Sequence, residues 1–327
     1  MDFRLTVEQR ELQAATRALL ARRFGRERLR AAVDAADAVE GGGGPDPVLW
    51  AELRRAGVFG LRGPDGLGLG LAEAVLVFEE LGRALVPGPL AATELAGALG
   101  LDGTAALVRL PAGRGPLLVE QLPGLDLLLV LDTDAGELRR VDPAEVAAGS
   151  EPVRAVDPLT PLWRVDAALP HGTVLDRADA ARVWAEGTLL TAALQVGLAD
   201  RAVRSAVVHA GQREQFGQPI GAFQAVQHLC ADMLARLEPA RVAVRAAAVA
   251  LDADGSTAAA RAAVAGAKLL ADEAAVRGAR DCLQVHGGMG FTWEADVQLL
   301  LKRSWVWQHS FAGAQECAEL LSSQLLL

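Results

Sequence analysis

The chain contains 327 residues with a formal net charge of −9, and 51% of its residues are hydrophobic although only 4% are aromatic and tyrosine is absent. This length allows two or three domains, and an apolar content supplied mostly by Ala, Leu and Val favours packed helices over twisted sheet. The acidic balance argues against binding of a phosphate backbone, and the scarcity of aromatic side chains argues against a stacking platform for nucleic acid.

Residues 1–104 are predicted to form an N-terminal helical domain. Apolar residues recur at helical spacing through residues 5–36, and Thr6 is placed as an N-cap before acidic residues in the first turns. The run G-G-G-G-P at 41–45 should interrupt this helix as a flexible connection. Further helices are expected at about 47–55, 71–85 and 91–99, with a glycine-rich segment at 60–70 between the first two.

Residues 105–177 have a different pattern and are predicted to form a small β-domain. Short apolar runs at 117–119, 127–131 and 174–175 are bounded by Gly, Pro and Asp, as is typical of strands. The segment D-T-D-A-G at 132–136 predicts a hairpin turn.

Residues 178–327 are predicted to form a C-terminal four-helix bundle, with helices at about 178–211, 223–251, 257–283 and 296–327. One apolar helical face is drawn by Phe223, Val226, Cys230, Met233, Leu234 and Leu237. Pro239 should either kink the second helix or start a new segment. The expected fold class is therefore α+β, mostly α.

The three cysteines are scattered and odd in number, and each lies in an apolar helical context. We expect buried free thiols rather than disulfides or a zinc site, and no metal site is predicted. The N-terminus lacks a basic-then-apolar signal pattern, and no charge-free run of eighteen apolar residues occurs. A soluble cytoplasmic protein is the expectation.

Two motifs in the C-terminal region suggest a functional site. The first, R-E-Q-F-G-Q-P-I at 213–220, begins with an arginine whose planar guanidinium can hold a phosphate through two parallel hydrogen bonds. The second, Q-V-H-G-G-M-G-F-T-W-E at 284–294, has three glycines within four residues, which allow backbone to approach a ligand closely. Taken alone, the glycines also fit a helix C-cap and turn, and Arg213 also fits a solvated ion pair.

This ordered pair of motifs resembles the acyl-CoA dehydrogenase flavoprotein family, which carries R-x-x-F-G-x-x-I followed by Q, and then Q-x-x-G-G-x-G-F/Y-x-x-E. Residues 1–10 and the segment F-E-E-L-G-R at 78–83 resemble the same family. The resemblance implies FAD as cofactor, an acyl-CoA substrate and an electron-transfer flavoprotein or similar acceptor. The implied reaction is α,β-dehydrogenation of the thioester, in which a carboxylate removes the α-proton and the β-hydrogen leaves as hydride.

The resemblance also assigns roles to single residues. Arg213 would contact the pyrophosphate of FAD, and Phe216 would lie against the adenosine side. Gln224 would be a polar contact in the same region. Gln284, Gly287 and Gly288 would supply polar and backbone contacts to a cofactor bound mainly by a neighbouring subunit. For Gln224 a solvated or core amide is an open alternative. His228 and His286 are candidate acids or bases, and a structural role is the alternative for both.

The sequence departs from the family in two places. Counting without gaps, one family position of the catalytic glutamate falls on Phe311 and the other on Gly187, beside Glu186. Because one residue along a helix is about 100° of rotation, Glu186 could act as the base only after a register shift. The T-E-P-x-x-G-S-D segment that contacts the flavin ring and the substrate is missing from the β-domain.

Both departures fit one hypothesis. The chain resembles the short subunit of heteromeric (α2β2) acyl-CoA dehydrogenases, in which a longer homologous subunit carries the base. The alternatives are a self-sufficient homo-oligomeric enzyme that uses Glu186, and a flavin-free structural subunit.

Overall fold

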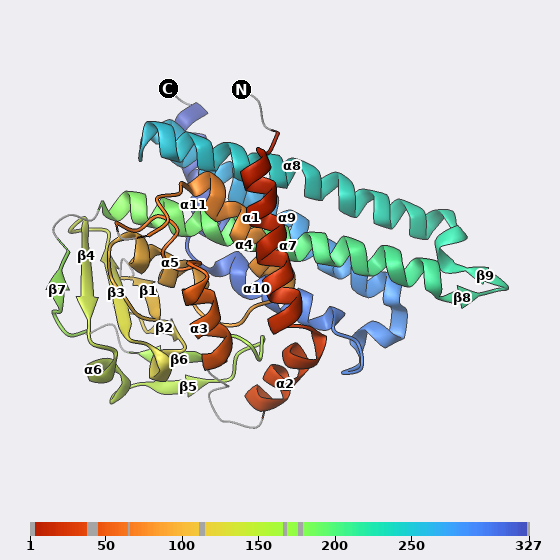
Figure 1. The fold of residues 1–327 in the computed structure, drawn as a ribbon, viewed down its shortest axis with the longest axis horizontal. Helices are drawn as coiled ribbons and strands as arrows, with labels where there is room; N and C mark the ends of the chain where they lie inside the picture. The colour runs from red at the N-terminus through yellow and green to blue at the C-terminus, as the bar shows by residue number, and fades with distance from the viewer. Residues whose placement is uncertain are drawn as a thin grey trace. The chain divides into compact units, whose positions relative to one another are not determined.

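The computed structural model describes residues 4–37, 45–64, 66–110, 115–165, 169–175 and 179–325 (Figure 1). The predicted flexible connection at 41–44 lies outside these residues. The chain divides into two compact units: unit 1 comprises Met1–Ala21, Val75–Val86 and Thr188–Leu327, and unit 2 comprises Arg22–Ala74 and Pro87–Gly187. The three-domain division drawn from the sequence stays a prediction.

The N-terminal third is helical, as predicted, with one additional break. The single helix expected at 5–36 is two helices, because the chain leaves the helical path at Phe24 and Gly25. Thr6 acts as the predicted N-cap: its Oγ1 accepts from the Gln9 amide at 3.2 Å, and Gln9 Oε1 accepts from the Thr6 amide at 3.1 Å. The helices are α1 (Val7–Arg23), α2 (Arg26–Asp37), α3 (Pro47–Arg55), α4 (Leu71–Ala84) and α5 (Leu90–Ala98).

The middle region forms two small sheets within unit 2, with strand orders β1-β3-β4-β7 and β2-β6-β5. β1 and β3 are parallel, whereas β3 and β4 form the predicted hairpin, whose turn is fixed by Asp132 Oδ1 accepting two backbone amides. Apolar side chains of both sheets and of α6 share one core. The elements are β1 (Ala105–Arg109), β2 (Leu117–Glu120), η1 (Leu122–Gly124), β3 (Leu127–Asp132), β4 (Glu137–Val141), α6 (Pro143–Ala147), β5 (Glu151–Val153), β6 (Leu162–Val165) and β7 (Thr173–Val174).

The C-terminal region is a bundle of long helices, in which α8 and α9 lie side by side (Figure 1). α8 continues through Pro239, and the fourth predicted helix is two, separated by residues 310–313. Met233 and Leu237 are buried as predicted, but Leu234 is exposed. The elements are α7 (Ala180–Gln212), β8 (Glu214–Gln215), β9 (Gln218–Pro219), η2 (Ile220–Ala222), α8 (Gln224–Asp254), α9 (Ala258–His286), η3 (Gly287–Phe291), α10 (Val297–His309) and α11 (Ala314–Leu325).

The three thiols are free, and Cys282 and Cys317 are fully buried whereas Cys230 is half-buried. Burial raises the pKa of the Cys282 thiol to about 12 and that of Cys317 to about 11. Both groups therefore remain protonated and act as small apolar side chains.

Unit 1 is held together where α4 crosses α7. A Cβ added to Gly82 would lie 2.1 Å from the Leu194 carbonyl oxygen, and one added to Gly197 would lie 1.8 Å from the Glu79 carbonyl oxygen. Each helix therefore presents a glycine to the backbone of the other, which allows closer contact than any side chain would permit.

Buried carboxylates surround this crossing. Glu79 pairs with Arg241 and Arg245 of α8, and Glu80 pairs with Arg17 of α1. Asp200 of α7 accepts from three arginines, namely Arg83, Arg204 and Arg241. Burial acts to raise the pKa of Asp200, but these guanidinium groups outweigh it and hold that pKa below its ordinary value.

Replacing Gly197 by Ala should separate the two helices. Overpacking of this kind costs about 1–3 kcal/mol, and we expect a loss at the upper end because the obstacle is backbone rather than a movable side chain. The measurement is the urea unfolding midpoint. Gly278→Ala in α9 is the matched control, since open space surrounds its Cβ position and helix propensity should make it neutral or mildly stabilising. Equal behaviour of the two variants would contradict the close crossing.

Candidate functional site

The first motif is a short hairpin at the end of α7. The backbone turns back after Arg213, whose amide still donates to the His209 carbonyl at 2.8 Å and whose carbonyl accepts from the Ile220 amide at 2.8 Å. Phe216 lies at the tip with φ 55 and is 93% exposed, and its ring meets that of Phe223 edge-on at 6.0 Å. The hairpin projects at the end of the bundle where α8 begins (Figure 1).

The second motif ends α9. Gly287 has a φ of 59 and its amide donates to the Gln284 carbonyl, so it closes the helix in a conformation that favours glycine. A Cβ at Gly287 or Gly288 would meet nothing within 4 Å. Both glycines are exposed and carry no side chain, so a ligand could approach the backbone closely here.

A pair of stacked histidines brings the two motifs together. The imidazole rings of His209 on α7 and His286 on α9 have centroids 4.0 Å apart and planes inclined by 18°. His209 is one helical turn before Arg213, and His286 immediately precedes Gly287. The six predicted cofactor residues, Arg213, Phe216, Gln224, Gln284, Gly287 and Gly288, therefore lie at one end of the bundle. His209 was missed from the sequence, where its only signal is its spacing from Arg213.

This end of the bundle fits an anionic dinucleotide such as FAD. Arg213 is exposed, and within the described residues its guanidinium has no carboxylate partner. Gln224 is the first residue of α8, whose N-terminal amides carry partial positive charge. A free guanidinium and a helix N-terminus are donors that suit a pyrophosphate, and the two exposed glycines leave room for it beside the backbone.

Large apolar side chains are exposed around the same donors. Phe216 and Phe291 are 93% and 75% exposed, and Met289 and Trp293 are each more than two-fifths exposed. The Trp293 ring also carries the Lys302 ammonium 4.5 Å from its centroid. An exposed apolar cluster beside polar donors is typical of an interface with another molecule.

Glu186, the candidate base, lies near the start of α7 in unit 2 and is buried and doubly paired. One carboxylate oxygen accepts from Arg182 at 2.8 Å, and the other accepts from Arg62 at 2.8 Å. Arg62 also donates to the buried Glu94 of α5 at 3.1 Å. Both carboxylate oxygens of Glu186 are thus already paired with guanidinium groups.

Glu94 responds differently to the same surroundings. Burial is the main cause that raises its pKa from 4.5 to about 7, and neighbouring Glu186 adds to the rise, against the opposing effect of Arg62 and the Leu61 amide. Glu94 is thus the carboxyl group of this cluster that changes charge near neutral pH.

The segment between α10 and α11, where a family glutamate was sought, holds no carboxylate. Phe311 adopts a φ of 58, and Ala312, directly before Gly313, is buried with its amide donating to Thr188 Oγ1 at 3.4 Å. The fully buried Lys268 donates to the Trp307 and Gln308 carbonyls at the end of α10 and pairs with Asp272 at 2.6 Å. This segment is held firmly, without a group able to accept a proton.

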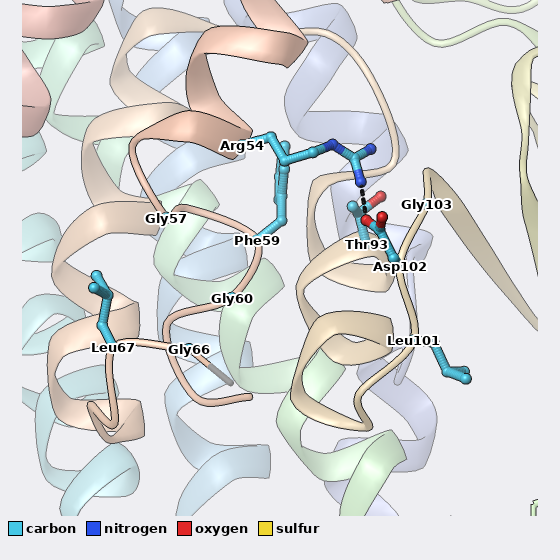
Figure 2. A pocket seen from close by; sticks show the side chains of 10 residues that line it. All are labelled: Arg54, Gly57, Phe59, Gly60, Gly66, Leu67, Thr93, Leu101, Asp102 and Gly103. Atoms are coloured by element: carbon cyan, nitrogen blue, oxygen red, sulfur yellow. Dashed lines mark hydrogen bonds and ion pairs between the residues drawn. The ribbon is translucent and has the colours of Figure 1, made fainter. Parts of the chain in front are cut away.

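A cavity of about 270 Å³ lies within unit 2, beneath the glycine-rich segment (Figure 2). Arg54 and Asp102, which both line it, form an ion pair, and none of the predicted site residues lines it. Among the residues that the structure describes, no group of three or more His, Cys, Asp or Glu side chains could hold a metal ion. The helices of these same ranges include none of sufficient length and apolarity to cross a membrane.

Family models match most of the chain. The model described as "Acyl-CoA dehydrogenase, N-terminal domain" matches residues 6–108, and the one described as "Acyl-CoA dehydrogenase, C-terminal domain" matches residues 180–321. Acyl-CoA dehydrogenase IpdE2 of Mycobacterium tuberculosis is 34% identical over 91% of each protein. Acyl-CoA dehydrogenase FadE34 of the same organism is 36% identical over 78% of this chain, but the chain spans only 39% of FadE34.

Two solved structures extend the likeness to the fold. The Tcur3481-Tcur3483 steroid ACAD G363A variant has a TM-score of 0.82 and 26% identity, and covers 98% of both chains. The ChsE4-ChsE5 complex from Mycobacterium tuberculosis also has a TM-score of 0.82, with 23% identity over 100% of this chain and 99% of the other. They share the mostly helical arrangement with a small sheet region and a C-terminal bundle.

The raised pKa of Glu94 predicts how stability depends on pH. Because the folded chain binds this proton more tightly than the unfolded chain, stability should fall as pH rises from about 4.5 to about 7. Because glutamine cannot ionise, Glu94→Gln should remove the contribution of Glu94 to this fall, which is on the order of 3 kcal/mol. Urea unfolding at a series of pH values measures it. The exposed Glu145→Gln in the same unit is the control and should keep the wild-type slope; an unchanged slope in Glu94→Gln would refute the assignment.

Proposed function

The chain belongs to the acyl-CoA dehydrogenase family of FAD-dependent oxidoreductases acting on CH–CH bonds. From this premise we propose that it takes part in the α,β-dehydrogenation of an acyl-CoA thioester within a heteromeric complex, in which it is the subunit without the catalytic base. The carrying observation is the exposed end of the bundle, where Arg213 has no described carboxylate partner and aromatic side chains are uncovered. A longer homologous subunit is the partner that we propose to cover this end.

The residues of this chain then have defined roles. Arg213 and the open backbone at Gly287 and Gly288 hold the diphosphate, and Phe216 packs against the adenosine side. Gln224 and Gln284 supply polar contacts at the rim. The bound FAD supplies the acceptor for the hydrogen that leaves the β-carbon as hydride. What this chain contributes is affinity and placement of the cofactor, together with exclusion of water by its apolar side chains.

Removal of the α-proton is assigned to the partner subunit. A general base must accept a proton at the operating pH, which neither an alanine nor a phenylalanine can do at 311–312. Glu186 is the remaining candidate, and both of its carboxylate oxygens are already occupied by arginine partners at 2.8 Å.

The acyl group is proposed from the comparisons. The Tcur3481-Tcur3483 protein, at 26% identity, is named as a steroid enzyme and bears two chain names. By that likeness we propose a bulky, steroid-type acyl-CoA and a two-chain assembly, with an electron-transfer flavoprotein or similar acceptor that reoxidises the flavin in the cytoplasm.

Co-expression with a longer family member tests the assembly. The purified complex should show flavin absorbance and oxidise acyl-CoA, whereas this chain alone should do neither. Arg213→Ala should lower the flavin content of the complex several-fold because a charge-assisted hydrogen bond to phosphate is lost. Arg277→Ala, which removes an exposed arginine of α9 that pairs with Glu273, is the control and should retain flavin. Stoichiometric FAD and acyl-CoA oxidation by the isolated chain would overturn the proposal.

Glu186→Gln distinguishes this proposal from a self-sufficient homo-oligomer. If the base lies on the partner, the complex should keep its turnover within about twofold. If Glu186 is the base, its replacement should lower turnover about 10²–10⁴-fold. Steady-state oxidation of acyl-CoA by the variant complex is the measurement. A loss of a hundredfold or more, with flavin content unchanged, would favour the homo-oligomeric alternative and Glu186 as its base.

A further inference from the structure

The stacked histidines occupy a position that the proposed function leaves unexplained. His209 and His286, hereafter the histidine pair, come from α7 and α9 and are both half-buried. Each is joined directly to one of the two cofactor motifs: the His209 carbonyl accepts the Arg213 amide at 2.8 Å, and His286 is the last residue of α9 before Gly287. The stacking of these two rings is therefore a direct contact between the segments that carry the two motifs.

A backbone hydrogen bond orients His286. Its Nδ1 lies 2.8 Å from the Cys282 carbonyl oxygen, which can only accept. Nδ1 is therefore the donor of this hydrogen bond. The same hydrogen bond fixes the ring in place for its stack with His209.

The surroundings of His209 oppose its protonation while no anion is present. Burial is the main cause that lowers the pKa of His209, and His286 of α9 and Arg213, directly after α7, add to it. Cys282 lies beneath His286 and interacts electrostatically with Cys230 of α8, and both thiols are neutral because their pKa values are raised. Asp281, which acts electrostatically on both thiols, pairs with Arg236 of α8. A bound diphosphate would reverse this balance.

We propose that the histidine pair positions the two cofactor motifs and takes up a proton when the diphosphate of FAD binds beside Arg213. This inference rests on the proposed function, because it requires the cofactor to lie at this end of the bundle. The anion offsets the charge of Arg213 and attracts an imidazolium, so the bound state binds a proton more tightly than the free state. By linkage, affinity for FAD rises as pH falls through the range just below the ordinary histidine pKa of about 6.5.

The size of the effect follows from the same linkage. A rise of one unit in a histidine pKa on binding corresponds to about a tenfold difference in FAD affinity across the pH range. The rings also hold the motifs in register, and an aromatic ring of similar shape can do that without binding a proton. Shape and charge can therefore be separated by substitution.

The test uses the co-expressed complex after removal of its flavin. FAD dissociation constants are measured by flavin fluorescence from pH 5.5 to 8 for the wild type, His209→Phe and His286→Phe. The wild type should bind up to about tenfold more tightly at the acidic end, and the phenylalanine variants should bind with little pH dependence. Calorimetry of the wild-type complex in buffers of different ionisation enthalpy gives a second readout, which should show net proton uptake on FAD binding near pH 6.5.

Arg213→Ala separates the two levels of the proposal. If it weakens FAD binding at every pH while both phenylalanine variants keep the wild-type pH dependence, the role of the histidine pair is refuted and the proposed function stands. Absence of proton uptake by the wild-type complex refutes it equally, even if a variant fails to fold. If Arg213→Ala leaves FAD affinity unchanged, or the complex binds no FAD, both the role of the pair and the proposed function are overturned.

Discussion

The contact between α4 and α7 is the constraint on which unit 1 depends. Gly82 and Gly197 bring two helix backbones within reach of each other, and the buried carboxylates Glu79, Glu80 and Asp200 lie around the crossing. Breaking one partner of a buried ion pair typically costs about 3–5 kcal/mol, because it leaves an uncompensated charge in the interior. Close backbone packing and charge pairing therefore support each other, and both are lost if the helices separate.

The rigid bundle explains why the two cofactor motifs meet. α7 and α9 end beside each other, so residues far apart in sequence reach the same place without a long loop. The acidic side chains differ from Arg213 in having ion-pair partners within the chain. Glu186 and the carboxylates of the α4–α7 crossing are paired with arginine, whereas Arg213 at the exposed end is left for a ligand. Fixed cations in a positioned frame are suited to holding an anion, whereas these carboxylates are already occupied by arginine.

Much of the fold could be predicted because local patterns agreed with the final packing. Strands β2 and β3 follow apolar runs bounded by turn residues, and the Thr6 cap is visible in the sequence. The break between α1 and α2 was missed because the apolar spacing continues across Phe24 and Gly25. β4 was indicated only by the hairpin turn before it, because its E-L-R-R-V sequence has few apolar residues and the strand gains its partners from β3 and β7.

The candidate site was predictable only where its residues form contiguous motifs. The segments at 213–220 and 284–294 were found, whereas the contact of His209 with His286 and the bridging of Glu94 and Glu186 by Arg62 join positions from separate elements. No spacing rule covers such contacts, because they depend on how helices pack in three dimensions. The prediction that the cofactor residues act at one FAD site stays a prediction.

The discontinuity of unit 1 has a consequence for synthesis. Its first two segments end at Val86, but their partners begin at Thr188 and extend past Arg245. At a translation rate of roughly 5–20 residues per second, the nascent α4 waits on the order of ten seconds before α7 and α8 leave the ribosome. During that interval Glu79 remains hydrated rather than paired with Arg241. Delivery of the late helices, rather than formation of the early ones, thus sets when this half of the molecule can become native.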